Sequence, residues 1–354
     1  MNENDIISKK WMVSEEELDD EQYKIRQLKQ DNYLIEGCAG SGKTVLALQK
    51  AKEIQDTGKG NYLVIVYTKA LRSFIKDGVK SLELDPHRVC HYDNLDDSGF
   101  EFADFIIVDE VQDFSQEEVS KLVKMAKKNF IFFGDDAQQL HSNKTGNMRL
   151  TKVKTIGNID DSHHKKLVKN YRLPLKIAEF AKFISTTQDN LIDRCVKLGG
   201  DKPLVTKHKG RDFELNAIHD IINNEGWTDV GILVATNKDI EYIKNYYINK
   251  DIDVEFKYDD KDDNTGHRET YNTLDFYSNK PKILTYHSSK GLQFEHVFLP
   301  FCEIDSDRLN YREALYVAVT RASENLFISY SNALSPFISR IPIDYYETKY
   351  NIHK

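Results

Sequence analysis

The stretch that decides the fold covers residues 33–48 and reads YLIEGCAGSGKTVLAL. Its apolar start predicts a short buried strand, its glycines predict a tight turn, and its apolar end predicts a helix. Gly37, Gly40 and Gly42 allow backbone conformations that a Cβ atom would forbid, so that consecutive N–H groups can converge on a phosphate chain. Every position of the pattern G-x-x-x-x-G-K-[ST] is met. The stretch therefore predicts a nucleoside triphosphate site, which we expect to hold ATP and Mg²⁺.

The last two residues of the pattern carry its specific chemistry. The Lys43 ammonium is expected to reach the β- and γ-phosphates, and the Thr44 hydroxyl is expected to ligate Mg²⁺. The loop residues expected to bind the nucleotide are Gly37, Cys38, Ala39, Gly40, Ser41, Gly42, Lys43 and Thr44.

Acidic residues follow the apolar run that begins at Phe105, in the sequence FIIVDEVQDFS. A parallel strand that is buried on both faces delivers such carboxylates at its C-terminal end. We expect Asp109 to hold Mg²⁺ through water and Glu110 to orient or deprotonate the attacking water. After the next apolar run, in GDDAQ, we expect Gln138 to sense the γ-phosphate.

The length and composition limit the class of protein. At 354 residues the chain exceeds the size of about 250–300 residues at which single cores stop growing, so we expect two domains. Hydrophobic residues make up 40% and charged residues 30%, which excludes disorder of the whole chain. The net charge of −8 argues against one large basic face that coats duplex DNA. It leaves room for a groove that binds phosphates through backbone N–H groups and hydroxyls.

The cysteines and the apolar runs indicate the compartment. Cys38, Cys90, Cys195 and Cys302 form no C-x-x-C pair, which is typical of reduced thiols without a zinc or disulfide framework. The apolar runs are too short to span a bilayer, and the start MNENDIISKKW lacks the apolar core of a signal peptide. We therefore expect a cytoplasmic protein without membrane contact.

Strand-like and helix-like segments alternate along the chain. This order predicts an α/β fold with mostly parallel sheets and right-handed crossovers. We expect one lobe over residues 1–165 and a second over 166–354. Three details belong to this prediction: a lysine-rich helix that extends to residue 128, a polar connection over 142–166, and a solvated acidic loop over 258–272.

The second lobe contributes two arginines, in the sequences NYR (170–172) and VTRA (319–322). Positioned positive charge accelerates phosphoryl transfer by ~10³–10⁵-fold when an arginine finger is in place. Arg172 and Arg321 would therefore make hydrolysis depend on closure of the two lobes.

The ordered set LDDEQ, GCAGSGKT, VYTKAL, DEVQD, GDDAQ, NYR, TYHSSKGLQF and YVAVTRA resembles the UvrD/Rep-type branch of superfamily 1 helicases, from Gln22 to Ala322. The resemblance implies two RecA-like lobes with ATP in the cleft between them and a single strand lying across both. It also implies that Gln22 recognises adenine, that Tyr171 stacks on the base, and that Arg172 and Arg321 contact the γ-phosphate.

The same resemblance assigns residues to nucleotide and strand in the segment TYHSSKGLQF. Gly291 would allow close approach to the nucleotide, and Gln293 stands where the family usually has a glutamate that touches the ribose. Other side chains would contact the nucleic acid or couple it to the nucleotide. They are Tyr67, Thr68, His91, His141, Thr285, His287 and Ser288.

Two further departures from the family bear on the activity. After GDDAQ the family usually carries a tryptophan that stacks on bases, whereas residues 139–144 read QLHSNK, with His141 as a partial substitute. Stacking on an aromatic side chain is worth ~1–3 kcal/mol per base, so the strand grip should be weaker. The interval from Thr68 to Asp109 is shorter than ~50 residues, and the second lobe itself needs most of the interval from Arg172 to Thr285. Neither of the family's large accessory insertions therefore fits.

These patterns lead to three functional hypotheses. The first is an ATP-dependent motor on single-stranded DNA, moving 3′ to 5′ as the resemblance implies. The second is a nucleic-acid-sensing ATPase subunit that regulates a partner nuclease or a repair or phage-defence protein. The third is an RNA-directed motor, because the strand would be held mostly by its backbone.

Overall fold

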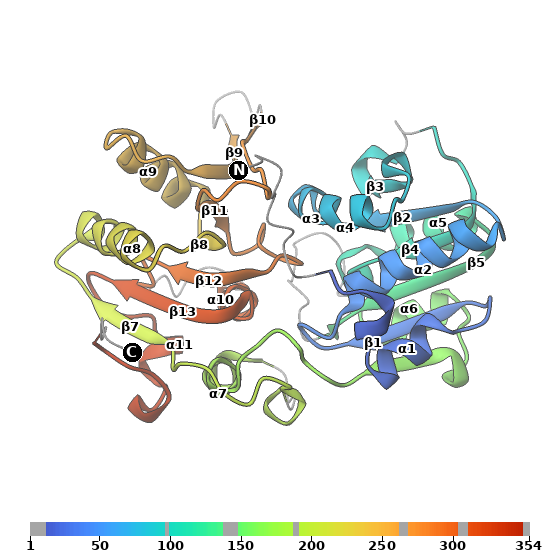
Figure 1. The fold of residues 1–354 in the computed structure, drawn as a ribbon, viewed down its shortest axis with the longest axis horizontal. Coiled ribbons are helices and arrows are strands. Elements are labelled where there is room, and N and C mark those ends of the chain that lie inside the picture. The colour runs from blue at the N-terminus through green and yellow to red at the C-terminus, as the bar shows by residue number, and fades with distance from the viewer. Residues whose placement is uncertain are drawn as a thin grey trace. The chain divides into compact units, whose positions relative to one another are not determined.

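The computed structural model describes residues 12–95, 99–136, 148–186, 191–261, 268–303 and 311–349. The chain forms two compact units, Met1–Tyr171 and Arg172–Lys354, and each is built around one sheet (Figure 1). The predicted α/β class with mostly parallel sheets is confirmed. No helix in the described ranges is long and apolar enough to cross a membrane.

The first unit contains a six-stranded parallel sheet in the order β3-β2-β4-β5-β1-β6. Its strands are β1 (Tyr33–Gly37), β2 (Tyr62–Val66), β3 (Val89–His91), β4 (Ala103–Val108), β5 (Ala126–Gly134) and β6 (His164–Leu167). The central strands are buried on both faces, which is why they read as continuous apolar runs in the sequence.

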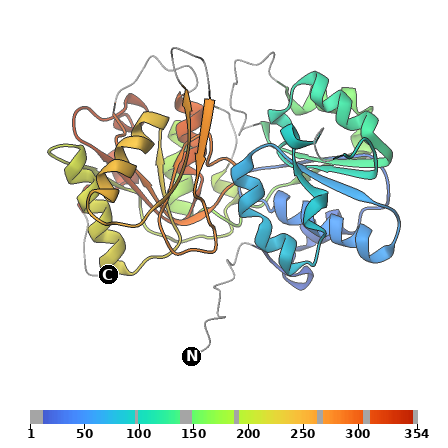
Figure 2. The same cartoon turned by 90° about the horizontal axis from the view of Figure 1, so that it is seen from above.

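Helices cover both faces of this first sheet. They are α1 (Asp20–Arg26), α2 (Lys43–Thr57), α3 (Lys69–Phe74), α4 (Lys76–Ser81), α5 (Gln116–Met125) and α6 (Leu150–Ile156). Figure 2 shows the teal and green helices α5 and α6 on one face and the blue helices on the other. Because β4, β5 and β1 are parallel neighbours, their carboxyl ends lie at the same edge of the sheet, and Gly37, Asp109 and Asp135 lie there together.

The second unit contains a seven-stranded sheet in the order β10-β9-β11-β8-β12-β13-β7. Its strands are β7 (Leu204–Lys207), β8 (Val230–Val234), β9 (Glu255–Lys261), β10 (Arg268–Asn272), β11 (Lys282–Thr285), β12 (Phe294–Leu299) and β13 (Ala322–Tyr330). All neighbours pair in parallel except β9 and β10, which are antiparallel. Its helices are α7 (Leu175–Ile184), α8 (Arg211–Glu225), α9 (Asn237–Ile248), α10 (Tyr311–Val319) and α11 (Pro336–Ser339).

Three local predictions were wrong. Helix α5 ends at Met125. Lys127 and Lys128 are exposed and lie among the first residues of strand β5 rather than in the helix. The segment 142–166 was predicted as a polar connection, yet it contains α6 and the start of β6. Strand β6 pairs with β1 at the sheet edge, so the first sheet continues beyond residue 165 to Leu167. Edge strands tolerate polar residues, which explains why this strand carried no apolar signal.

The acidic segment 258–272 is the third difference. Its two ends form the strands β9 and β10, which pair in antiparallel fashion, and the Tyr258 and Tyr271 rings stack with centroids 5.0 Å apart. Cross-strand aromatic pairs stabilise a hairpin even where most neighbours are charged.

Candidate functional site

The phosphate loop connects β1 to α2 and needs glycine for two reasons. Gly40 and Gly42 have φ angles of 72° and 87°, in the left-handed region that favours glycine. A Cβ atom on Gly37 would lie 2.4 Å from Ser41 Oγ, and one on Gly42 would lie 2.5 Å from Gln22 Nε2. The loop thus closes tightly on itself and on α1, and larger residues would open it.

Polar atoms point into this loop. Lys43 is buried, and its Nζ donates hydrogen bonds to the carbonyl oxygens of Gly37 at 2.7 Å and Cys38 at 3.2 Å. The Ser41 hydroxyl is buried without a hydrogen-bond partner among the described residues. A buried ammonium, an unsatisfied hydroxyl and a glycine-lined backbone fit an anionic phosphate chain.

Thr44 and Asp109 form the centre of the site. Asp109 directly follows strand β4, and the Thr44 hydroxyl in the first turn of α2 donates a hydrogen bond to Asp109 Oδ2 at 2.6 Å. Asp109 is only 1% exposed. Burial and the neighbouring Glu110 raise the pKa of Asp109 to about 6, against the opposing effects of Thr44 and Lys43. A hydroxyl and a carboxylate in contact are oxygen ligands of the kind that Mg²⁺ prefers.

Glu110 is held in a strained position beside Asp109. Its φ of 57° is rare for a residue with a side chain, and its backbone N–H donates to Asp109 Oδ1 at 3.0 Å. Gln112 Nε2 donates a short hydrogen bond to Glu110 Oε2, and Gln112 Oε1 accepts one from the Asp135 N–H at 3.0 Å. Gln112 therefore links the ends of β4 and β5 and orients the Glu110 carboxylate. Strained residues of this kind cluster at functional sites.

Gln22 and Tyr171 lie on the same side of the phosphate loop. Gln22 Nε2 donates to the Ser41 carbonyl at 3.1 Å, and the Tyr171 N–H donates to the Gly40 carbonyl at 3.0 Å. Asp19 joins them, because its side chain accepts hydrogen bonds from the Gln22 N–H and from the Tyr171 hydroxyl. The two residues expected to recognise the base are thus brought together, and the boundary between the units falls directly after Tyr171.

Sequence reasoning missed the roles of Asp19 and Gln112. Both occur inside the motifs LDDEQ and DEVQD, but nothing in the letters shows that they hold neighbouring residues in place. For Asp19 a signal existed, because Asp three residues before Gln is the pattern of a helix capping box. The structure contains that box at the start of α1.

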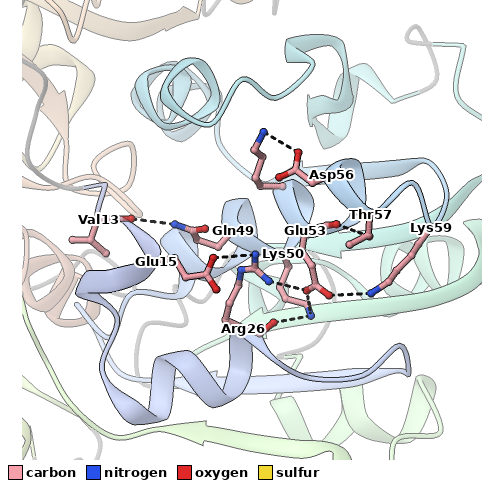
Figure 3. Close-up of polar contacts among 10 residues, drawn as sticks. Val13, Glu15, Arg26, Gln49, Lys50, Glu53, Asp56, Thr57 and Lys59 are labelled. Atoms are coloured by element: carbon pink, nitrogen blue, oxygen red, sulfur yellow. Dashed lines mark hydrogen bonds and ion pairs between the residues drawn. The ribbon is translucent and has the colours of Figure 1, made fainter.

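An ion-pair network around the buried Lys50 fixes α1 against α2 (Figure 3). Lys50 Nζ donates to the carbonyl oxygens of Arg26 at 3.1 Å and Leu28 at 3.0 Å, and it pairs with Glu53 Oε2 at 2.6 Å. Arg26 and Lys59 also pair with Glu53, at 3.1 and 3.3 Å. Burial lowers the pKa of Lys50. Burial alone would raise the pKa of Glu53, but Lys50 outweighs this effect and holds it below its usual value. The network therefore positions the helix that carries Gln22.

In the second unit, the expected γ-phosphate arginines share one cluster. Arg321 is 1% exposed, and its guanidinium donates to the carbonyl oxygens of Val317 at 2.9 Å and Leu292 at 3.2 Å. Arg172 Nε donates to Gln293 Oε1 at 3.0 Å, and its Nη1 donates to the Thr320 carbonyl at 3.4 Å. Gly291, in the KGLQF segment that also contains Leu292 and Gln293, has a φ of 78°. The residues of NYR, KGLQF and VTRA thus meet, although they are far apart in the sequence.

The residues expected to contact nucleic acid fall into two groups. In the first unit, Tyr67 and Thr68 follow β2, and His91 ends the neighbouring strand β3. The Tyr67 ring packs edge-on against the Phe114 ring, with centroids 5.2 Å apart, and burial raises the pKa of Tyr67 to about 12. Thr68 caps α3 through the Leu71 N–H, and His91 is largely buried.

The other group lies at the end of β11 in the second unit, where Thr285 is the last residue of the strand. Thr285 Oγ1 donates to Ser288 Oγ at 3.1 Å and accepts from the Ser288 N–H at the same distance, while His287 is exposed. Two expected site residues, Gln138 and His141, lie outside the described residues.

Comparison with protein families identifies the chain. Residues 33–204 match the family model described as the viral superfamily 1 RNA helicase core domain, and residues 282–329 match the UvrD-like helicase C-terminal domain. The chain belongs to superfamily 1 of the helicases. The prediction of a superfamily 1 helicase is confirmed at this level, and family membership implies an enzyme that binds and hydrolyses a nucleoside triphosphate.

Several solved structures resemble this superfamily 1 helicase. The C-terminal domain of a possible DNA helicase from Lactobacillus plantarum WCFS1 is 20% identical with a TM-score of 0.37, over 50% of this chain and 98% of that one. The helicase of the virus PRRSV is 16% identical with a TM-score of 0.48, over 88% and 53%. Arterivirus nonstructural protein 10, also a helicase, is 17% identical with a TM-score of 0.45, over 87% and 61%. The chain thus spans between half and two thirds of the two viral helicases, and no curated protein matches it.

Proposed function

We propose that this helicase is an ATP-dependent motor on single-stranded nucleic acid, that its polymer is DNA, and that it moves 3′ to 5′. The cluster of Lys43, Thr44, Asp109 and Glu110 carries the proposal, because it combines a phosphate cradle with a metal ligand and a positioned base. DNA as the polymer is what the resemblance to the UvrD/Rep-type branch implies, and the match of residues 282–329 to a UvrD-like helicase C-terminal domain supports that resemblance.

The mechanism follows from what each side chain does. The Lys43 ammonium exchanges the carbonyl oxygens of Gly37 and Cys38 for the β- and γ-phosphate oxygens. Thr44 and Asp109 would hold Mg²⁺, directly and through water, and the cation would neutralise charge that develops on the phosphates. Glu110, oriented by Gln112, accepts a proton from the attacking water.

Arg172 and Arg321 are the proposed γ-phosphate contacts from the second unit. Each guanidinium is already held by backbone carbonyl oxygens of the same cluster, so little conformational entropy would be lost when it engages a phosphate. Coupling between the nucleotide and the nucleic acid would run through Thr285, His287 and Ser288, which lie at and just after the end of β11 in the sheet of the second unit.

An RNA-directed motor is the second candidate. The observation that favours it is the match of residues 33–204 to a core domain described for viral RNA helicases. Recognition through the phosphate backbone alone would not distinguish the two polymers.

The test is steady-state ATP hydrolysis with matched oligonucleotides of deoxythymidine and uridine, with Lys43→Ala as the blank. Stimulation by the DNA strand of at least tenfold over RNA supports the first candidate, and the reverse preference replaces it with the second. ATP turnover that neither strand stimulates contradicts a self-sufficient motor and favours an ATPase subunit that requires a partner. For the direction, displacement of streptavidin from a biotin at the 5′ end, but not from one at the 3′ end, is the expected result.

A further inference from the structure

The second unit contains a cavity of about 340 Å³ that belongs to none of the helicase motifs. It lies between α8 and the strands β7, β12 and β13, which are neighbours in Figure 1. Ligand pockets in proteins usually have volumes of ~300–1,000 Å³ and mostly apolar walls with a few polar groups. Apolar side chains dominate this wall, among them Ile218, Ile221, Phe298 and Phe327.

One residue that lines the cavity has an unsatisfied carboxylate oxygen. Glu214 is 0% exposed, and its Oε2 accepts hydrogen bonds from the Phe301 N–H at 2.9 Å and the Ser329 hydroxyl at 2.6 Å. Its Oε1 has no hydrogen-bond partner among the described residues, and Glu214 lines the cavity. An unsatisfied buried carboxylate oxygen is costly, so a group that donates a hydrogen bond to it would be stabilised.

The charges around the cavity favour a cation. The ionisable residues that line it are Glu214, Asp220 at the exposed mouth, and His208. His208 Nε2 is hydrogen-bonded to Thr206 Oγ1 at 2.9 Å, and burial lowers its pKa, which keeps the ring neutral. Burial also raises the pKa of Glu214, and an adjacent ammonium would favour its ionised form.

We propose that this cavity is a binding site for a small apolar molecule that carries an amine, with the ring or chain between α8 and the sheet and the amine on Glu214 Oε1. The site is independent of the phosphate cradle, because its residues and those of the cradle lie in different units of the chain.

The protein carries its own reporter for this site. The Trp227 ring lies 6.2 Å from Phe298 and 5.5 Å from Phe327, and both phenylalanines line the cavity. The chain contains two tryptophans, so Trp11→Phe leaves Trp227 as the single emitter.

The experiment titrates the Trp11→Phe protein with 2-phenylethylamine and with 3-phenylpropionate, which has a similar apolar body but the opposite charge. We expect a saturable change in Trp227 emission with the amine, with a Kd on the order of 1 mM for a fragment of this size. The anion should bind at least ~10-fold more weakly.

Three variants locate the binding. Glu214→Gln keeps an oxygen for Phe301 and Ser329 but turns an NH₂ group into the cavity, and it should weaken the amine at least ~10-fold. Ala217→Phe fills the cavity from a partly exposed position on α8 and should abolish binding of the amine. It tests the site independently if Glu214→Gln folds poorly. Glu241→Gln, on the exposed face of α9, is the matched control and should bind like the parent.

Two outcomes would overturn the proposal. One is the absence of any saturable response to the amine. The other is equal binding of the amine by the parent, Glu214→Gln and Ala217→Phe, with all three shown to be folded by their thermal unfolding.

Discussion

Asp109→Asn should stabilise the protein while abolishing its turnover. Asp109 is buried at the end of β4, and its pKa is raised from an ordinary 3.8 to about 6, first by burial and then by Glu110. Because its folded-state pKa exceeds the unfolded value, ionisation opposes folding. The penalty is absent below pH 3.8, grows as the pH rises, and is complete above pH 6.

The size of the effect follows from the shift. A shift of about two pKa units corresponds to about 3 kcal/mol of unfolding free energy at pH 8, and the linkage relation leaves roughly half of this at pH 5. Asparagine keeps an oxygen for the Glu110 N–H, and the Thr44 hydroxyl can accept from the new NH₂ group. The variant should therefore gain about 1–3 kcal/mol at pH 8 and roughly half as much at pH 5.

Urea unfolding followed by circular dichroism at pH 5 and pH 8 measures this difference. Asp160→Asn replaces an exposed carboxylate of the same unit whose side chain makes no capping hydrogen bond to the turn that follows it. It is the control and should change stability by less than ~0.5 kcal/mol. A variant that is less stable than the parent at pH 8, or whose gain does not grow with pH, would refute the assignment of a buried carboxylate with a raised pKa to Asp109.

Three further substitutions test other parts of the site. Glu110→Gln should bind ATP with near-normal affinity but hydrolyse it at least ~10²-fold more slowly in single-turnover assays, since it loses the base; an unchanged rate removes Glu110 from the chemistry. Arg321→Lys should keep the buried charge and the nucleotide affinity but lower kcat at least ~10-fold, because an ammonium cannot reproduce the guanidinium contacts to Val317 and Leu292. A normal kcat would contradict a γ-phosphate role for Arg321. Lys50→Met should lower the free energy of unfolding in urea by about 2–3 kcal/mol, less than the ~3–5 kcal/mol typical of a broken buried ion pair, because Arg26 and Lys59 still neutralise Glu53. A loss below ~1 kcal/mol would show that the network does not hold α1.

The phosphate loop was predictable because its requirements are local. The positive φ angles at Gly40 and Gly42 and the close approach at Gly37 arise within one turn of chain, so the residue types alone report them. The carboxylates Asp109 and Glu110 were predictable for a related reason. A continuous apolar run of a strand buried on both faces ends immediately before them.

The parts that sequence reasoning missed depend on pairing between distant segments. Strand β6 reads HKKL, and it is a strand because it hydrogen-bonds to β1 at the edge, where His164 Nε2 lies 3.0 Å from Glu36 Oε2. The hairpin of β9 and β10 likewise depends on Tyr258 meeting Tyr271. Periodicity describes which face of an element is buried. It does not report that a short polar segment completes a sheet.

The carboxyl edge of the first sheet concentrates features that oppose folding. Asp109 is a buried acid, Glu110 has an unfavourable φ beside it, and the Lys43 ammonium is withdrawn from water. They persist because fully buried parallel strands and the Lys50 and Glu53 network over-determine the surrounding structure. A phosphate chain would give the Lys43 ammonium an anionic partner, and a bound cation would favour the ionised form of Asp109. Binding would therefore offset the free-energy cost of burying these charged groups. For this reason, a site that destabilises the empty protein can be selective for a nucleotide with its metal.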